Sequence, residues 1–356
     1  MPADHAPNSS VTEAVIQLNV SRDRGVSWLL SRIGDDGEPV DAGIVNSWYR
    51  VPWVLATVGR IPEAARVMSW IERHALSAAG DLVPGPPQNP WTNANACYPL
   101  AILAVGAWHL ERYDTASAIM DTLTMSFVDA ETGGAYVERP EHRSTGRQDV
   151  LCTAQLGLAA LETGREDLAH GVYNWMTELL AAQPGLPDTL YLSRTRDGLV
   201  RDFAQDQAFG HVIEFQQPRQ AYFNPGIGAA FLGRYHQRIG QPSALALAND
   251  LLTLSSGGTE MQYDYADTVH VGKLAWGASV VLDSDAGDST LAILLRMTQW
   301  FVDCQEADGR WNPSHFLFPE PTEGDALWKT GEHIMIINQM MAALSGIHRG
   351  PVGRDR

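Results

Sequence analysis

The sequence predicts an all-α fold, an (α/α)6 toroid of six helical hairpins with a small β-hairpin in one long loop. Three observations predict it. A short turn followed by an Ala-rich helix recurs along the chain, the helices on either side of these turns differ in polarity, and the connections alternate between short and long. A recurring helical hairpin is typical of a solenoid or a closed ring. Six hairpins are the number that closes known toroids.

The recurring turn is clearest at three places, in segments 58–64, 163–169 and 239–244, and weaker copies begin at Arg112 and Ala286. A Gly at the turn suits the left-handed residue that ends one helix, and a Pro or Asp suits the start of the next. Each turn therefore joins two neighbouring helices in a tight hairpin.

The helices before the turns are apolar all round, as in 98–108 and 150–161, whereas those after them are amphipathic, as in 63–74 and 166–180. Helices that are apolar all round are buried, and amphipathic helices cover them. The pattern therefore predicts an inner ring inside an outer ring. The predicted helices, outer then inner in each pair, span 11–32 and 45–58, 62–77 and 94–109, 114–127 and 148–162, 166–182 and 220–236, 243–255 and 269–282, and 288–305 and 331–346.

The connections give the predicted ring one functional face. Loops from an outer to the next inner helix are long and rich in Gly, Pro and aromatic residues, and in the longest of them a β-hairpin is expected from 190–192 and 198–200. All these loops fall at the N-terminal ends of the inner helices, where we expect the pocket. The single toroid domain is predicted to span 11–348, with 1–10 disordered and 349–356 a flexible tail.

Composition and net charge argue against some classes of binding partner. The chain has 42 acidic residues against 25 Lys and Arg, a formal charge of -17, which argues against a nucleic-acid or anionic-membrane partner. No stretch reaches the ~20 apolar residues of a membrane helix, no signal peptide is evident, and the three cysteines form no disulfide framework. We expect a cytoplasmic protein with a small-molecule substrate, no cofactor and no metal. Homo-oligomer formation stays open.

Four short segments resemble known toroid enzymes. Segment 304–311, with Gln305 and Asp308-Gly309-Arg310-Trp311, is similar to the turns of terpenoid-cyclase-type repeats. Segments 129–136, 210–215 and 328–333 resemble the Gly-Gly loop, the Gly-His-x-x-Glu-aromatic element and the final Trp-Lys-…-His element of the N-acylglucosamine 2-epimerase superfamily. The resemblance implies the (α/α)6 fold and supports histidine acid–base chemistry in the last two elements. The Asp-x-Asp-Asp acid of squalene-cyclase-type enzymes is absent.

The first turns of the predicted inner helices, and the loops before them, are strongly polar, and they supply the candidate site. Histidine titrates near neutral pH and a carboxylate can orient it. The candidates for catalysis are therefore His211, Glu214, His270, Glu332, His333 and Asp149. The candidates for substrate binding are Tyr49, Arg50, Asn95, Tyr98, Arg147, Cys152, Arg219, Tyr222, Asn224, Lys273, Trp276, Trp311 and Trp328. Four cations among them indicate a ligand rich in anionic or hydroxyl oxygens, or ion pairs with nearby carboxylates.

Three functions fit these residues. The first is an isomerase or epimerase on a small polar, sugar-like substrate, in which a His/Glu pair moves a proton next to a carbonyl and arginine holds the substrate oxygens. The second is a lyase, dehydratase or cyclase acting on a terpenoid-like alcohol, in which a carboxylic acid donates the proton and aromatic side chains shelter the cation. The third is a toroid that binds a small molecule without catalysis.

Overall fold

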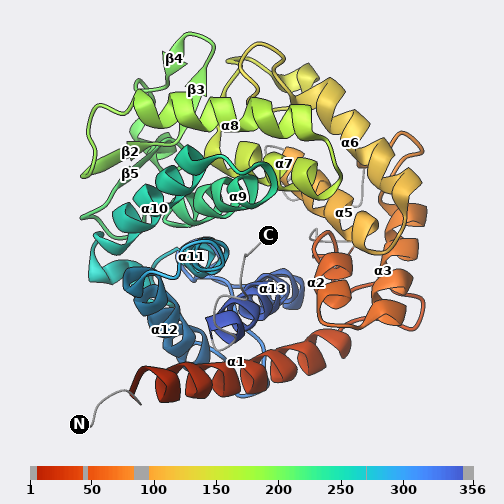
Figure 1. Ribbon diagram of the computed structural model, residues 1–356. Coiled ribbons are helices and arrows are strands. Elements are labelled where there is room, and N and C mark those ends of the chain that lie inside the picture. Colours follow the sequence, from red (N-terminus) through yellow and green to blue (C-terminus); the bar gives the residue numbers. More distant parts are fainter. Residues whose placement is uncertain (1–5, 43–46, 84–95, 270, 348–356) are drawn as a thin grey trace, which may run out of the picture.

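The computed structural model describes residues 6–42, 47–83, 96–269 and 271–347, and its helices form two concentric rings (Figure 1). The inner ring consists of α2 (Val51–Thr57), α5 (Cys97–His109), α7 (Val150–Glu162), α9 (Phe223–Ile239), α11 (Lys273–Leu282) and α13 (Glu323–Ile347). The outer ring consists of α1 (Ala6–Leu30), α3 (Ile61–His74), α6 (Tyr113–Phe127), α8 (Glu166–Ala181), α10 (Pro242–Ser256) and α12 (Asp288–Asp303). The predicted toroid fold is confirmed.

The inner ring closes on itself. Each inner helix contacts the next, and α13 returns to contact α2, while α1 packs against both α12 and α13 (Figure 1). The first and last helices of the chain therefore lie side by side and complete the ring. Among the helices that the structure describes, none is long and apolar enough to cross a membrane.

Burial follows the polarity of the sequence. In the inner helix α5 every residue from Cys97 to Ala107 is buried, whereas the outer helix α3 buries Ala64, Val67, Met68, Trp70 and Ile71. The α3 residues recur at helical spacing on one face, as an amphipathic helix on a core requires. The buried apolar residues form one cluster that continues around the ring.

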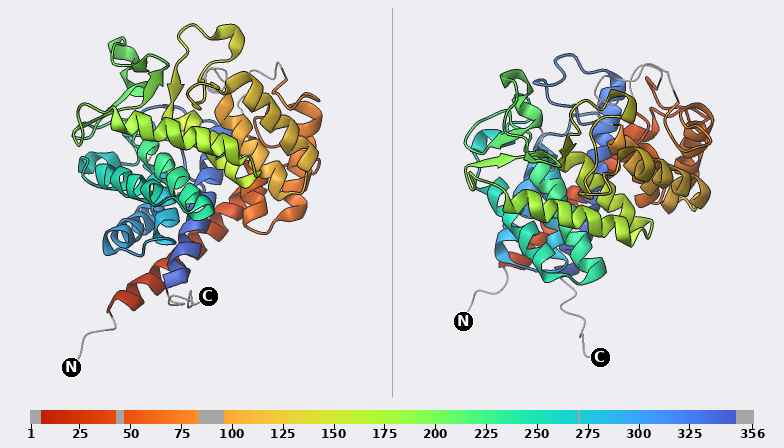
Figure 2. Two further views of the ribbon diagram at one scale, coloured as in Figure 1. Left: turned by 45° about the horizontal axis from the view of Figure 1, so that its top comes forward. Right: turned by 90° about the horizontal axis from the view of Figure 1, so that it is seen from above.

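Short strands occupy the same end of the ring as the long connections, and both described chain ends lie toward the opposite end (Figure 2). β1 (Gln148–Asp149) pairs with β3 (Ser193–Thr195), which pairs with β4 (Gly198–Leu199). A second sheet pairs β2 (Thr189–Tyr191) with β5 (Val212–Glu214). The predicted hairpin of 190–192 with 198–200 is therefore wrong in its pairing, because 189–191 pairs with 212–214 and the hairpin forms within 193–199.

Three predicted boundaries differ from the structure. Helix α1 begins at Ala6, inside the segment expected to be disordered, and α2 begins at Val51 rather than at 45. Helix α13 begins at Glu323 rather than at 331, because Thr322 and Asp325 cap each other reciprocally: each side chain accepts the other residue's backbone N–H, at 3.0 and 3.1 Å. The earlier start places Glu332 and His333 in the third turn of α13.

Candidate functional site

A buried cluster of charges joins three helices at the loop-rich end of the ring. Lys273, the first residue of α11, donates to Glu332 of α13 at 2.7 Å. Lys329, one turn earlier in α13, donates to the other carboxylate oxygen, Oε1, at 3.1 Å. Arg50 at the start of α2 lies 3.1 Å from Oε2, the oxygen that Lys273 binds. All four side chains are buried, and Arg50 is only 1% exposed. We call Arg50, Lys273, Lys329 and Glu332 the charge cluster.

Arg50 spends only part of its hydrogen-bonding capacity within the protein. Its Nη2 donates to the hydroxyl of Tyr98 at 2.8 Å and pairs with Glu332. Its Nε and Nη1 are buried and have no hydrogen-bond partner among the described residues. The rings of Tyr49 and Tyr98 lie 5.5 and 5.6 Å from the guanidinium carbon and wall the group in.

The charge cluster holds its members in unusual protonation equilibria. Burial favours a neutral Glu332, but Lys273, Lys329 and Arg50 together hold its pKa well below the usual range. Burial, opposed by Glu332 and assisted by Lys273, lowers the pKa of Lys329 to about 8, and burial also lowers that of Lys273. One carboxylate thus faces three cationic side chains in a site shielded from water, where charges interact strongly.

A second polar group lies where α7 begins. Asp149 caps α7 by accepting the backbone N–H of Cys152 at 2.8 Å, and Arg147 lies 4.0 Å from its other oxygen. Asp149 is the register partner of Ser193, whose hydroxyl lies 2.8 Å from Nδ1 of His211. We call Arg147, Asp149, Ser193 and His211 the acid–base group.

The two titratable members of the acid–base group have opposite shifts. Burial raises the pKa of Asp149 in spite of Arg147, which shifts its equilibrium toward the protonated form. Burial together with Arg147 lowers the pKa of His211 to about 4, so this imidazole is neutral at pH 7. Phe203 stacks on the His211 ring at 4.8 Å between centroids. A carboxyl group with a raised pKa and a neutral imidazole therefore lie at the same end of the toroid.

Tyr98 and two thiols connect the acid–base group with the charge cluster. Burial raises the pKa of Tyr98 to about 12, although the neighbouring Arg50 lowers it. Cys152 lies close enough to raise the pKa of Tyr98 further. Burial also raises the pKa values of Cys97 and Cys152, with Asp149 contributing to both. Both thiols are therefore protonated near neutral pH, and Cys152 is near enough to influence Tyr98 as well as Asp149.

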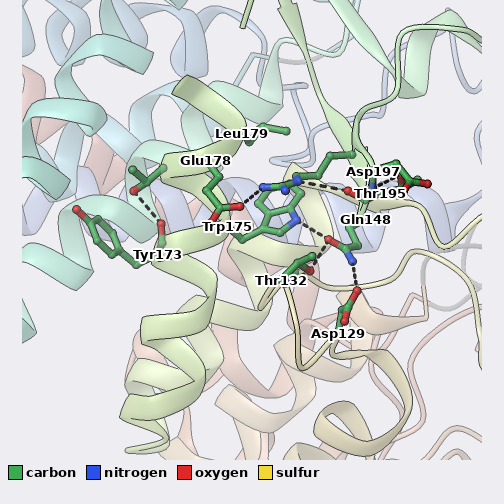
Figure 3. Close-up of polar contacts among 12 residues, drawn as sticks. Asp129, Thr132, Gln148, Tyr173, Trp175, Glu178, Leu179, Thr195 and Asp197 are labelled. Atoms are coloured by element: carbon green, nitrogen blue, oxygen red, sulfur yellow. Dashed lines mark hydrogen bonds and ion pairs between the residues drawn. The ribbon is translucent and has the colours of Figure 1, made fainter. Parts of the chain in front are cut away.

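A buried hydrogen-bond network anchors the strand that carries Asp149 (Figure 3). The side-chain oxygen of Gln148 accepts from Trp175 at 2.6 Å and from Thr132 at 2.9 Å, and its amide donates to Asp129 at 2.9 Å. Asp129 in turn accepts two bonds from Arg196, in the turn between β3 and β4, at 2.7 and 2.8 Å. The network fixes β1 against α8 and ties the 193–199 hairpin to it, which holds Asp149 and Ser193 in register.

No family model and no curated protein matches the chain in sequence. Solved structures do resemble it. Cellobiose 2-epimerase from Spirochaeta thermophila has a TM-score of 0.67 at 12% identity, over 98% of this chain and 100% of that one. D-mannose isomerase gives 0.67 at 12%, over 91% and 97%, and a type II terpene cyclase from Scytonema with geranylgeranyl dihydroxybenzoate gives 0.58 at 14%, over 94% and 99%. The chain has the toroid fold of these enzymes. Unrelated reactions share such a fold, so the reaction must be argued from the site.

The toroid brings together many of the residues predicted to act at this end. Arg50, Lys273, Glu332, Tyr98 and Tyr49 meet in and around the charge cluster. Arg147, Asp149, Cys152 and His211 meet in and beside the acid–base group. Trp328 lies at the edge of the charge cluster, with its ring 4.6 Å from Nζ of Lys329, on helix α13 rather than on a loop.

Other predicted site residues have local partners instead. Glu214 is exposed on β5, and the partner of His211 is Ser193, so the predicted His211–Glu214 pair is not formed. Arg219 is half-exposed and pairs with Asp267 at 2.6 Å. Tyr222 donates its hydroxyl to the Phe215 and Gln217 carbonyls, and Asn224 donates to the Ala221 carbonyl, which makes both loop anchors.

His333, Trp311 and Trp276 lie in the core. His333 is fully buried among the rings of Tyr265, Trp300, Phe301 and Trp311, at 5.0–6.4 Å between centroids. It therefore faces outer helix α12, because consecutive residues of a helix point about 100° apart and Glu332 already faces the ring. Trp311 donates to the Phe301 carbonyl at 2.9 Å, and Trp276 packs edge-on against Trp53.

The predicted residues Asn95 and His270 lie outside the described part of the chain. Two residues of the site are absent from the sequence predictions. Lys329 is three residues before Glu332, a spacing that would have placed both on one helix face had α13 been predicted to start early enough. Ser193 had no sequence signal, because only the pairing of β3 with β1 brings it to His211.

Proposed function

We propose that this protein is an enzyme that moves a proton on a carbon next to the carbonyl of a small, polar, sugar-like substrate, as an isomerase or epimerase does. The observation that carries the proposal is the neighbourhood of the acid–base group and the charge cluster, linked through Tyr98 and Cys152. Such a reaction needs a base, an acid and a positive site for the oxygen on which charge develops. The described residues supply all three at one end of the toroid.

The proposed division of labour follows from the protonation states. His211, neutral at pH 7, takes the proton from the substrate carbon. It acts in the tautomer whose Nδ1–H donates to Ser193, which leaves the lone pair on Nε2. The C–H electron pair forms the enediolate, whose negative charge is stabilised by the positive field of the neighbouring charge cluster. Asp149 is the proposed acid: burial raises its pKa, which favours the protonated form, and the acid donates its proton to the opposite oxygen or carbon. The negative charge of the enediolate raises the pKa of the imidazolium as it forms, which offsets the influence of Arg147.

Solvent deuterium tests the proposal. Incubation of the protein in D2O with aldoses and ketoses should place deuterium on the carbon next to the carbonyl, and His211→Ala should abolish the exchange. His236→Ala is the matched control, because His236 bonds only the Gln241 carbonyl at the end of α9. If His211→Ala exchanges as fast as the unaltered protein, the assignment of the base is wrong.

A cyclase or lyase reaction is a second candidate, favoured by the buried acid Asp149 and by aromatic pairs on the inner wall. Trp53 and Trp276 lie 6.0 Å apart and Tyr49 and Tyr98 lie 6.4 Å apart, both edge-on, an arrangement suited to shelter a cation. Conversion of a polyprenyl alcohol that stops in Asp149→Asn but continues in His211→Ala would favour it. Ligand binding with neither conversion nor exchange would favour the non-catalytic toroid.

A further inference from the structure

The charge cluster is unbalanced. Among the ion pairs of the described residues, Glu332 is the only carboxylate that contacts Arg50, Lys273 or Lys329, so three cations share one anion. Each of these residues is at most 7% exposed. Burying a charge without a partner costs several kcal/mol in a protein. A bound anion would balance the excess positive charge of the cluster.

The positions of the lysines in the sequence point to the same excess of positive charge. The sequence contains only two lysines, Lys273 and Lys329, and both belong to the charge cluster, whereas all its other strong cations are arginines. Lysine carries a compact charge whose pKa responds to burial, and it is a point donor to phosphate or carboxylate oxygens. Both lysines of the sequence, whose pKa values respond to burial, therefore lie together beside Glu332.

Arg50 points to where an additional oxygen would bind. Its Nε and Nη1 are buried without a partner among the described residues, while Nη2 is fully used by Tyr98 and Glu332. A buried donor that is left unpaired costs about 1–3 kcal/mol, and more when it is charged. An oxygen of a bound molecule would satisfy these donors.

Helix ends reinforce the positive site. Lys273 opens α11, Tyr98 lies in the first turn of α5, and the ring of Phe223, which opens α9, is 5.3 Å from Nζ of Lys273. The N-termini of these three helices therefore lie beside the charge cluster. Each carries a partial positive charge that favours an anion.

We infer that the charge cluster binds an oxyanion, a carboxylate or phosphate group that the substrate carries in addition to its reacting carbonyl. This inference rests on the proposed function for its link to catalysis, and it narrows the substrate from a neutral sugar to a sugar acid or sugar phosphate. Arg50 supplies the unpaired donors, and the two lysines supply the charge. A neutral sugar would leave the excess positive charge uncompensated.

Binding of the oxyanion is tested first without catalysis. The full chain labelled with ¹³C at the lysine ε-carbons gives two lysine signals, assigned with Lys329→Arg. Inorganic phosphate and acetate are titrated in at constant ionic strength, with chloride as the reference. Both signals should shift with saturation, the Lys329 pKa should rise, and Tm should increase with anion concentration.

Two variants check that the effect belongs to the charge cluster. Lys329→Gln should weaken anion binding by about tenfold or more, because it removes one buried cation. Arg219→Gln should leave binding unchanged, because Arg219 is exposed and paired with Asp267. Lys329→Arg keeps the charge and should bind, which guards against a fold defect in Lys329→Gln. Unshifted lysine signals, or equal weakening by Arg219→Gln, would overturn the inference.

The substrate series separates this inference from the proposed function. D-mannose, D-mannuronate and D-mannose 6-phosphate are compared for deuterium exchange and for binding, which also distinguishes carboxylate from phosphate. Exchange with D-mannose alone, without anion binding, would overturn the inference and leave the proposed function standing. Saturable anion binding without deuterium exchange into any of the sugars would support the oxyanion site and contradict the proposed function.

Discussion

Lys273 and Glu332 bond at 2.7 Å between helices α11 and α13, and both side chains are buried. The two residues are 59 positions apart in the sequence. Because the bond joins the start of one inner helix to the third turn of another, it couples the charge balance of the site to the packing of the ring.

Replacement of Glu332 by Gln should destabilise the fold. The substitution leaves Arg50, Lys273 and Lys329 buried without their carboxylate, and loss of one partner of a buried ion pair costs about 3–5 kcal/mol. Urea unfolding measures the change. Glu178→Gln is the control, because Glu178 is exposed and its pair with Arg194 should contribute less than about 1 kcal/mol. Equal effects of the two substitutions would contradict the view that Glu332 balances the cluster.

Because of Lys329, the free energy of unfolding should vary with pH in the alkaline range. Its folded pKa of about 8 lies below the usual value of 10.5, so between these values the unfolded chain binds more protons than the folded one. The contribution of Lys329 to the free energy of unfolding therefore rises with pH across this window, and its penalty is greatest below pH 8.

The comparison that isolates this term is the unaltered protein against Lys329→Met. The stability advantage of Lys329→Met should shrink as pH rises from about 7 to 10.5, by up to about 3 kcal/mol. Direct titration of the lysine ε-carbon signal should give a midpoint near 8. A midpoint near 10.5 would show that Lys329 is hydrated and outside the charge cluster.

His211 should set the acid limb of the activity profile. Because burial and Arg147 lower its pKa to about 4, the neutral base persists well below pH 6.5, and kcat/KM should fall only as pH approaches about 4. His211→Asn should reduce kcat by about 10²–10⁴-fold, the usual contribution of a positioned base. An acid limb near pH 6.5 that persists in His211→Asn would assign the base to another group.

Gly226 should be sensitive to the addition of one methyl group. A Cβ on Gly226 would lie 2.3 Å from the Lys273 backbone, so Gly226→Ala must push α9 away from α11 and displace the first residue of the charge cluster. We expect destabilisation of about 1–3 kcal/mol, as for other overpacked cores, measured by thermal unfolding. Gly346→Ala, in the last turns of α13 with no atom near its Cβ position, should be neutral or stabilising. Similar effects at both positions would show that α9 and α11 can separate at little cost.

Much of the ring could be predicted because its signals are local. Turns such as 163–166 carry the residues that end one helix and start the next, and the contrast between α5 and α3 assigns helices to the inner or outer ring. The start of α13 was mispredicted because the capping pair of Thr322 and Asp325 lies in a segment that reads as a loop.

The candidate site was predicted in composition but only partly in partnership. Arg50, Lys273 and Glu332 were each expected at the loop-rich end, yet no local pattern shows that they meet. Glu214 was a candidate partner of His211 because both belong to segment 210–215, which resembles the epimerase element, but β5 is extended there and a contact between residues three apart requires a helix. The role of Ser193 arises from strand pairing across 44 residues of chain, from Asp149.

By itself the sequence determined the helical hairpins, their order in two rings and the polar character of one end, because helix periodicity and turn residues act over a few positions. Only the tertiary structure decided which of the polar side chains share a site. In the closed ring Glu332 faces two lysines and an arginine, whereas its neighbour His333 lies among aromatic rings. Adjacent residues of one helix acquire opposite roles in this way, because the partners that reach each of them come from distant parts of the chain.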